Sequence, residues 1–214
     1  MTNGGDAPFT VLMVCTGNIC RSPIAERLLR VQSAALALPV MVHSAGTQSM
    51  VGHDMTPEAA HLAAHYGADP ADHISKQLTE QQIQDADLIL TATREHRSKV
   101  VSLYPRAARY TYTLNQFARL LPTAVDSFVD PANAPPTSVE LVEAPRPDLA
   151  TQLRALVREV AATRGFSPPP PHPDDDDIED PYRQSTAVYA RVGTILNATV
   201  TQIAQSLAAA TRTR

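Results

Sequence analysis

The chain has only two cysteines, Cys15 and Cys20, and no tryptophan among its 214 residues. Two thiols are too few for a disulfide framework or for an all-cysteine zinc site. Positive charge is also scarce, since 18 Lys and Arg residues stand against 22 Asp and Glu residues. This balance argues against a general affinity for nucleic acid or for anionic lipid. Any anion site must therefore be small and local.

Long apolar runs are absent as well. No stretch approaches the roughly 18 uncharged apolar residues that a membrane span needs, and residues 1–9 lack the basic and then apolar pattern of a signal peptide. We therefore expect a soluble, cytoplasmic protein that makes no membrane contact. With 43% hydrophobic residues, the chain has enough apolar surface to bury a core.

Short apolar segments alternate with helical patterns along the first 121 residues. Strands are predicted at 9–14, 40–44, 87–91 and 109–113, and helices at 22–38, 57–66, 79–85, 95–103 and 114–121. Alternation of this kind predicts an α/β fold with a parallel sheet covered by helices on both faces.

The pattern changes after Leu121. Prolines at 122, 131, 135, 136, 145 and 147 predict irregular structure, and an amphipathic helix is expected only at 148–164. A polyproline stretch at 167–173 and an acidic run at 174–177 indicate a flexible, solvated linker over 167–178. A last helix is predicted at about 186–209. We interpret 1–214 as one domain, with a core of 9–121 and 180–210 and an insertion at 122–179.

The most informative segment directly follows the first predicted strand. It reads Cys15-Thr16-Gly17-Asn18-Ile19-Cys20-Arg21-Ser22, and Ser22-Pro23 can begin a helix as N-cap and first residue. A loop wrapped around a helix N-terminus offers converging backbone N–H groups and the positive end of the helix dipole. Gly17 and Asn18 tolerate the left-handed conformations that such a loop needs. The segment therefore predicts a site for phosphate or a similar oxyanion.

The same segment can supply a nucleophile. A thiolate at Cys15 is stabilised by the helix N-terminus and by Arg21. The planar guanidinium of Arg21 can hold two phosphoryl oxygens as the phosphoryl group becomes trigonal. Ser22 can donate a hydrogen bond to the sulfur when it leaves. Since the loop and the arginine supply the charge stabilisation, we expect neither a metal nor another cofactor.

The segment from Val14 to Glu26, VCTGNICRSPIAE, resembles the signature of the low-molecular-weight protein tyrosine phosphatases. The resemblance covers Phe9–Leu121 and about Asp180–Leu207. It implies a three-layer αβα fold with a four-stranded parallel sheet, to which the helical, proline-rich insertion is added. It also implies a hydrolase that removes phosphate from a phosphorylated protein, above all from phosphotyrosine, through a phosphocysteine on Cys15. The phosphate-binding residues would be Thr16, Gly17, Asn18, Ile19, Cys20 and Ser22.

Members of this family need a general acid from an Asp-Pro pair on a late loop. Two such pairs occur in the chain. Asp180-Pro181 stands directly ahead of the last helix and matches the family's position, whereas Asp130-Pro131 heads the proline-rich insertion. We therefore predict Asp180 as the general acid and base.

The resemblance also implies support and specificity around the loop. Ser44 and His73 match positions that hydrogen-bond the loop asparagine, here Asn18. Tyr182 can form one wall of the cleft against an aromatic leaving group. The family's usual cleft aromatic after the second strand is missing, and Met50 is expected to provide an apolar wall there.

Other functions remain open. Arsenate is isosteric with phosphate, and a version of arsenate reduction that uses an external thiol needs no further cysteine. Protein arginine phosphatases carry threonine where this loop has Ile19, whose apolar side chain favours an aromatic neighbour. An inactive phosphate-binding or interaction protein, with the insertion as its partner surface, is the alternative from a different class.

Several other patterns have simpler interpretations. The resemblance suggests a reversible disulfide between Cys15 and Cys20, and packing of Cys20 is the alternative. His61 and His65 lie four apart on a predicted helix but lack the glutamate of a zinc-protease motif, so we interpret them as surface residues.

Overall fold

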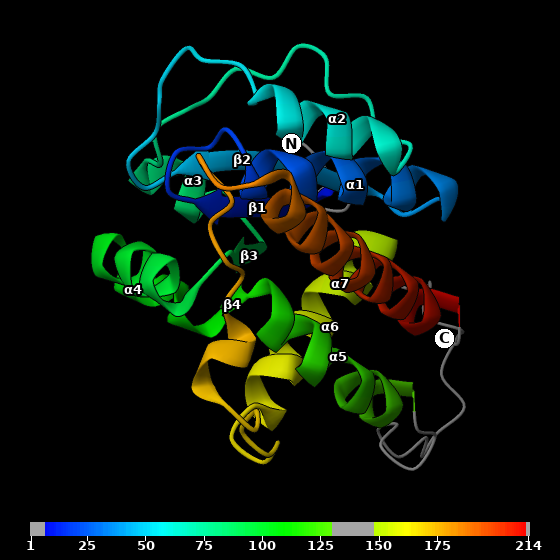
Figure 1. The fold of residues 1–214 in the computed structure, drawn as a ribbon. Helices are drawn as coiled ribbons and strands as arrows, with labels where there is room; N and C mark the ends of the chain where they lie inside the picture. Colours follow the sequence, from blue (N-terminus) through cyan, green and yellow to red (C-terminus); the bar gives the residue numbers. More distant parts are fainter. Residues whose placement is uncertain (1–6, 130–147, 213–214) are drawn as a thin grey trace, which may run out of the picture.

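The computed structural model describes residues 7–129 and 148–212. Four parallel strands form one sheet in the order β2-β1-β3-β4 (Figure 1). These are β1 (Phe9–Cys15), β2 (Val40–Gly46), β3 (Leu88–Thr91) and β4 (Thr111–Thr113). The strands are short and rich in apolar and β-branched residues, as is usual for a sheet buried on both faces. The predicted fold class is confirmed.

The helices lie on both sides of this sheet (Figure 1). They are α1 (Arg21–Ala35), α2 (Pro57–His65), α3 (Glu80–Gln84), α4 (Arg94–Leu103), α5 (Leu114–Val129), α6 (Leu149–Thr163) and α7 (Thr186–Arg212), with 3₁₀ turns η1 (Pro105–Arg109) and η3 (Pro173–Asp176). Successive side chains of β1 point to opposite faces of the sheet and pack in two hydrophobic cores. Met13 faces the larger core under α1, α5, α6 and α7, and Leu12 faces the smaller one beside α3 and α4.

The insertion contributes to the larger core. Buried residues on one face of α6 are Leu153, Leu156, Val157 and Val160, which form the predicted apolar stripe, whereas Leu149 at its start is exposed. Arg154 ties α6 to the sheet, because its Nε atom lies 2.9 Å from Asp87 Oδ1 at the start of β3. The helix of the insertion is therefore packed against the sheet.

The prediction of irregular structure after Leu121 is wrong for residues 122–129, because α5 continues through Pro122. A proline inside a helix normally leaves the carbonyl four residues earlier without its donor. Here that carbonyl, on Ala118, accepts a hydrogen bond of 2.9 Å from Gln202 Nε2 of α7. The continued helix buries Ala124, Val125 and Phe128. Tertiary packing therefore compensates for the proline.

The prediction of a solvated linker holds for Asp174 and Asp175, which are exposed, but is wrong for residues 176–178. Asp176 is buried and paired with Arg119, and the Ile178 side chain is fully packed in the core. The proline-rich half, 167–173, is largely exposed, as predicted. None of the helices within 7–129 and 148–212 has the length and apolar character needed to cross a membrane.

Candidate active site

The loop 16–20 joins β1 to α1 at the carboxyl end of the sheet. Asn18 adopts the left-handed conformation with φ +56°, as predicted, whereas Gly17 does not. The helix begins at Arg21 rather than after an N-cap at Ser22, so Pro23 falls within its first turn. Proline is tolerated there because the first N–H groups of a helix have no partner inside the helix.

The carbonyl groups of the loop all turn outward. Each one from Cys15 to Ile19 accepts a hydrogen bond from a neighbouring segment: from the N–H groups of Thr47 (2.9 Å), Gln48 (3.0 Å) and Met50 (3.0 Å), from His73 Nε2 (2.7 Å) and from Thr56 N–H (3.0 Å). In a trans peptide the following N–H points the opposite way. The N–H groups of residues 16–20 therefore converge on the interior of the loop.

Cys15 lies buried at the base of this ring of N–H groups. Its sulfur is 3.0 Å from Ser22 Oγ. Asn18 Nδ2 donates to Ser22 Oγ (2.9 Å) and to Ser44 Oγ (2.8 Å). Because the Ser22 oxygen accepts from Asn18, its own hydrogen is left to point at the sulfur. The Cys15 sulfur therefore has a fixed hydrogen-bond donor.

A buried network holds Asn18 in place. Ser44 and His73 both contact it, as the resemblance implies, and Lys76 N–H donates to Asn18 Oδ1 (2.8 Å). Burial lowers the pKa of His73, which keeps the ring neutral as a donor to the Asn18 carbonyl. The side-chain amide of Asn18 thus uses both donors and its acceptor.

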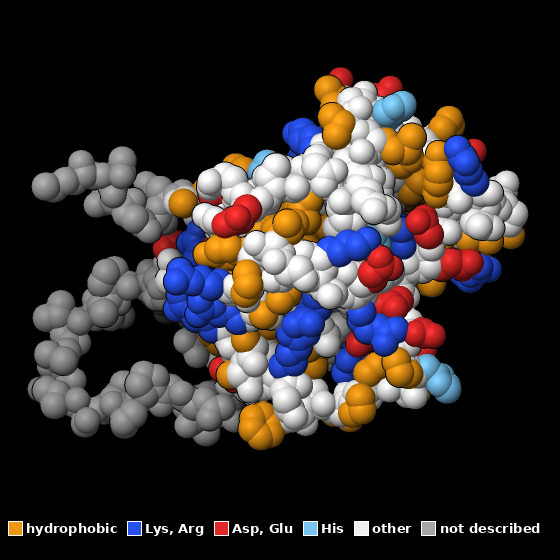
Figure 2. Space-filling model, turned by 90° about the vertical axis from the view of Figure 1, so that its left-hand side faces the viewer, with side chains coloured by type: hydrophobic (Ala, Val, Ile, Leu, Met, Phe, Trp, Pro, Cys, Tyr) orange, Lys and Arg blue, Asp and Glu red, His pale blue; other side chains and the backbone are white. Residues whose placement is uncertain are grey.

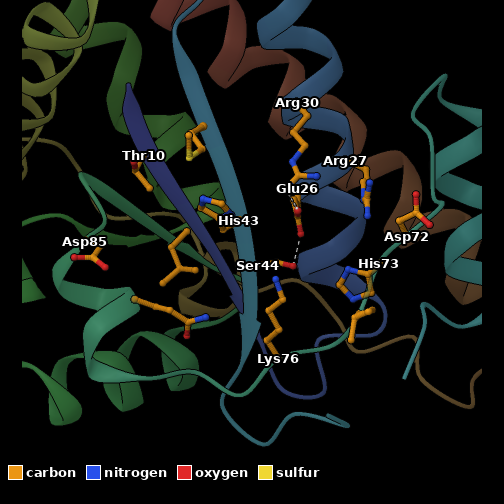
Figure 3. Close-up of a pocket in the computed structure, with 14 residues that line it drawn as sticks. Thr10, Glu26, Arg27, Arg30, His43, Ser44, Asp72, His73, Lys76 and Asp85 are labelled. Carbon is orange, nitrogen blue, oxygen red and sulfur yellow. Dashed lines mark hydrogen bonds and ion pairs between the residues drawn. The ribbon is translucent and has the colours of Figure 1, made fainter. Parts of the chain in front are cut away.

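Sequence reasoning missed Glu26, which ends this network. Figure 3 shows Glu26 of α1 directed at Ser44 of β2, whose hydroxyl donates to Glu26 Oε2. Glu26 also forms an ion pair with Arg30 one turn further along the helix. A cavity of about 440 Å³ runs along this side of the network. The local sequence carried no distinctive signal for this role, because Glu26 followed four residues later by Arg30 is also the pattern of a surface ion pair on a helix.

Sequence reasoning also missed His96, at the start of α4. Its Nε2 atom lies 2.8 Å from Thr16 Oγ1 of the loop, and its Nδ1 atom lies 2.7 Å from Thr93 Oγ1. Burial, and then the nearby charge of Arg21, lower the pKa of His96 to about 4. The ring is therefore neutral at physiological pH and bridges α4 to the loop.

Arg21 lies almost fully buried beside the loop with its guanidinium directed into the site. Nη1 donates to the Ile178 carbonyl (2.9 Å), and Nη2 donates to Asp180 Oδ2 (2.7 Å). Asp180 itself is half-exposed. Asp130, the other candidate acid, lies outside the described residues. Of the two Asp-Pro pairs, Asp180-Pro181 therefore has an observed place at the site.

A small cavity of about 210 Å³ lies above the Cys15 sulfur. It is lined by Cys15, Thr16, Gly17, Ile19, Cys20, Arg21, Gln48, Met50, Asp180 and Tyr182. The predicted apolar walls, Met50 and Tyr182, both reach it. A nucleophile at the base, a cation at the side, a carboxylate at the rim and an apolar wall suit displacement at a phosphoryl group.

Cys20 is a second buried thiol in the loop. Its sulfur lies 3.5 Å from Tyr189 Oη and 3.6 Å from Thr56 Oγ1, and burial raises its pKa. Both cysteines are free thiols. The disulfide with Cys15 that the resemblance suggests stays a prediction.

A nucleophilic cysteine loop at the end of the first strand of a parallel sheet defines a class of phosphate-loop enzymes in which cysteine carries the phosphoryl group. Within this class, residues 10–166 match the family of low molecular weight phosphotyrosine protein phosphatases. The chain belongs to this family. The matched segment runs past Leu121 into the insertion and stops before Asp180.

Individual relatives agree with this assignment. The chain is 40% identical over 109 residues to the low molecular weight protein-tyrosine-phosphatase Etp of Escherichia coli, covering 50% of this chain and 70% of Etp. It is 30% identical over 160 residues to the protein-arginine-phosphatase of Bacillus subtilis, covering 72% and 98%. The crystal structure of a low molecular weight protein tyrosine phosphatase from T. tengcongensis matches with a TM-score of 0.62 at 26% identity, covering 92% and 98%.

Proposed function

We propose that this chain hydrolyses phosphate monoesters on proteins, with phosphotyrosine as its preferred residue, through a phosphocysteine intermediate. The observation that supports this most strongly is the position of the Cys15 sulfur, which lies inside converging N–H groups and beside Arg21 and Asp180. The two buried free thiols favour a reducing compartment, so we propose the cytoplasm as its location.

In the first step, the Cys15 thiolate attacks phosphorus as the bond from phosphorus to the leaving oxygen breaks. The electron pair of that bond goes to the leaving oxygen, which takes a proton from the Asp180 carboxyl group. Arg21 and the loop N–H groups hold the three remaining phosphoryl oxygens. The products of this step are the free alcohol or phenol and the phosphocysteine.

In the second step, a water molecule attacks the phosphocysteine. The Asp180 carboxylate accepts a proton from that water, the sulfur–phosphorus bond breaks, and inorganic phosphate is released. The electron pair returns to sulfur as a thiolate. The hydroxyl of Ser22, held by Asn18, stabilises this leaving thiolate.

The walls of the cavity favour an aromatic leaving group. Ile19, Met50 and Tyr182 present apolar atoms around the opening. Ile19 has no hydroxyl with which to orient a phosphoguanidinium group. These contacts support phosphotyrosine over phosphoarginine as the substrate.

Phosphoarginine nevertheless deserves a direct test, because a relative described as a protein-arginine-phosphatase aligns with this chain over 98% of its own length. Matched peptides that differ only in phosphotyrosine or phosphoarginine would be compared by kcat/KM. We expect a higher kcat/KM for dephosphorylation of the phosphotyrosine peptide, and we expect Ile19→Thr to bring the two kcat/KM values closer together. A higher kcat/KM of wild type for the phosphoarginine peptide would overturn the proposed preference.

The activity itself is tested with p-nitrophenyl phosphate. Wild type is expected to turn over, Cys15→Ser to be inactive, and Asp180→Asn to lose about 10²-fold or more in kcat. His61→Gln, an exposed change on α2, serves as the control and should retain activity. Wild type without turnover, or a fully active Cys15→Ser, would contradict the proposal.

A further inference from the structure

Residues 174–180, here called the acidic strap, lead from η3 to the segment before α7. Figure 1 shows this segment in orange, running from η3 past β4 toward the end of β1 before it enters α7. It contains six carboxylates within seven residues. On the face that carries α4, acidic and basic side chains lie interleaved (Figure 2). The carboxylates of the strap pair with two arginines, Arg94 and Arg119.

The first anchor of the strap is Arg94, at the start of α4. Its guanidinium lies 2.9 Å from Asp177 Oδ2 and 2.5 Å from Asp174 Oδ1. Its backbone N–H also donates to Asp177 Oδ1 (2.8 Å). The Asp174 side chain is 91% exposed and the Asp177 side chain only 27%. Because solvent weakens exposed ion pairs, Asp177 provides the stronger anchor.

The second anchor lies on α5. Arg119 Nη2 is 3.1 Å from Asp176 Oδ2, and the Asp176 side chain is only 8% exposed. Asn115 Nδ2 also donates to the carbonyl of Asp175 (3.0 Å). The strap is thus attached to α4 and to α5 by carboxylates at neighbouring positions.

Between these anchors and the site lies Ile178. Its N–H donates to the carbonyl of Ala92, just after β3, and its side chain is buried. Its carbonyl accepts the hydrogen bond from Arg21 Nη1. Asp180, two residues later, binds Arg21 Nη2. The strap therefore accepts a hydrogen bond from each terminal nitrogen of the Arg21 guanidinium.

We propose that Asp177 is a positioning residue, which together with the Asp176 anchor holds the strap so that Asp180 and Arg21 are correctly placed for proton transfer. The proposal rests on the proposed function. Neither aspartate touches the cavity. Their effect passes through Ile178, and a displacement of about 1 Å at a catalytic group is enough to cost up to 10²-fold in rate.

The test compares two neutral variants that share a partner. Asp177→Asn removes the better buried carboxylate on Arg94, and Asp174→Asn removes the exposed one. Activity is measured as kcat/KM on p-nitrophenyl phosphate and on phenyl phosphate, whose leaving oxygen is far more basic and depends more on the general acid. Asp177→Asn should lose about 10-fold more on phenyl phosphate than on p-nitrophenyl phosphate. Asp174→Asn should leave the ratio of the two substrates unchanged.

A second measurement separates positioning from a general loss of stability. In the Asp180→Asn background, Asp177→Asn should cause no further change in the ratio of the two substrates, because the group that it positions is already absent. Arg94→Lys keeps the positive charge but loses the planar guanidinium that binds Asp177 through two nitrogens. It should therefore shift the ratio of the two substrates in the same direction as Asp177→Asn, by a smaller factor. Thermal unfolding of each variant is the check that it is folded.

The outcomes distinguish the two proposals. An unchanged ratio in both Asp177→Asn and Arg94→Lys, with wild type active, would overturn the positioning role alone. An equal loss on both substrates that persists in the Asp180→Asn background would show a merely structural role. Inactive wild type would contradict the proposed function itself.

Discussion

The phosphate loop and the acidic strap reach the same cavity but are held in different ways. The loop 16–20 is fixed by backbone carbonyls that are each bonded from outside and by the buried amide of Asn18. The strap is fixed chiefly by carboxylates paired with Arg94 and Arg119, partly in contact with water. Added salt, or neutral substitutions in the ion pairs of the strap, should therefore displace the strap and leave the loop intact.

Among changes that leave Cys15 in place, the largest effect is expected from replacing the planar guanidinium of Arg21. Arg21→Lys keeps the charge, but a single ammonium group cannot hold two phosphoryl oxygens and reach the strap carbonyl at once. We expect kcat on p-nitrophenyl phosphate to fall by about 10³-fold. The matched control is Arg106→Lys in η1, an exposed residue away from the loop and the strap. Near-normal activity of Arg21→Lys would contradict the proposed role of the Arg21 guanidinium in holding the phosphoryl group.

The second largest loss of activity is expected from adding a methyl group at Gly46, which should displace the loop. A Cβ atom there would collide with the carbonyl oxygen of Thr16 and lie 3.0 Å from the Asn18 nitrogen. Gly46→Ala should lower kcat by about 10²-fold by displacing loop N–H groups. Gly165→Ala, where an added Cβ has free space, is the control. Equal activity of the two variants would show that the loop is less tightly held than its contacts indicate.

Acid should weaken the contact between α4 and the loop. The pKa of His96 is about 4 in the folded chain and 6.5 for an ordinary histidine, so between these values the unfolded chain binds more protons. Stability is therefore fully present above pH 6.5 and is lost as the pH falls toward 4. The loss is on the order of 3 kcal/mol.

Urea unfolding at pH 7 and pH 4.5 measures this effect. His96→Gln should be less stable at pH 7 and should show a smaller drop on acidification than wild type. His61→Gln, at an exposed position, should behave as wild type. The same drop in all three proteins would assign the acid sensitivity to other groups.

The smallest effect is expected from salt. In 1 M sodium chloride the ion pairs of Arg94 are screened, so activity on phenyl phosphate should fall about two- to three-fold more than activity on p-nitrophenyl phosphate. Arg94→Ala should show this larger loss on phenyl phosphate already at low salt, and added salt should increase the loss only slightly. Lys99→Ala, on the same helix but paired with Glu95, is the control. Salt dependence that is unchanged in Arg94→Ala would exclude these pairs as its source.

The comparison also shows what the sequence could reveal. The strands and the loop depend on local patterns, such as the apolar run before Cys15 and the Gly-Asn pair after it, and these were predictable. The continuation of α5 was not, because the compensation for Pro122 comes from Gln202, 80 residues later. The burial of Asp176 was missed for the same reason, since its partner Arg119 lies on α5. Long-range contacts leave no local pattern.

Support residues were predictable only where the resemblance supplied them. Ser44 and His73 have no distinctive local pattern, and the structure places both against Asn18. Glu26 and His96 were missed, because a buried glutamate or histidine on a helix is distinguished from a surface one only by its tertiary neighbours.

The central claim is the phosphocysteine on Cys15, and trapping it is the most direct test. Asp180→Asn is mixed with p-nitrophenyl phosphate and denatured within milliseconds, and the intact mass and peptide map are recorded. The account predicts one added phosphoryl group, located on the peptide that contains Cys15 and absent from Cys15→Ser. Turnover by Asp180→Asn without an adduct, or an adduct on Cys20 instead, would contradict it.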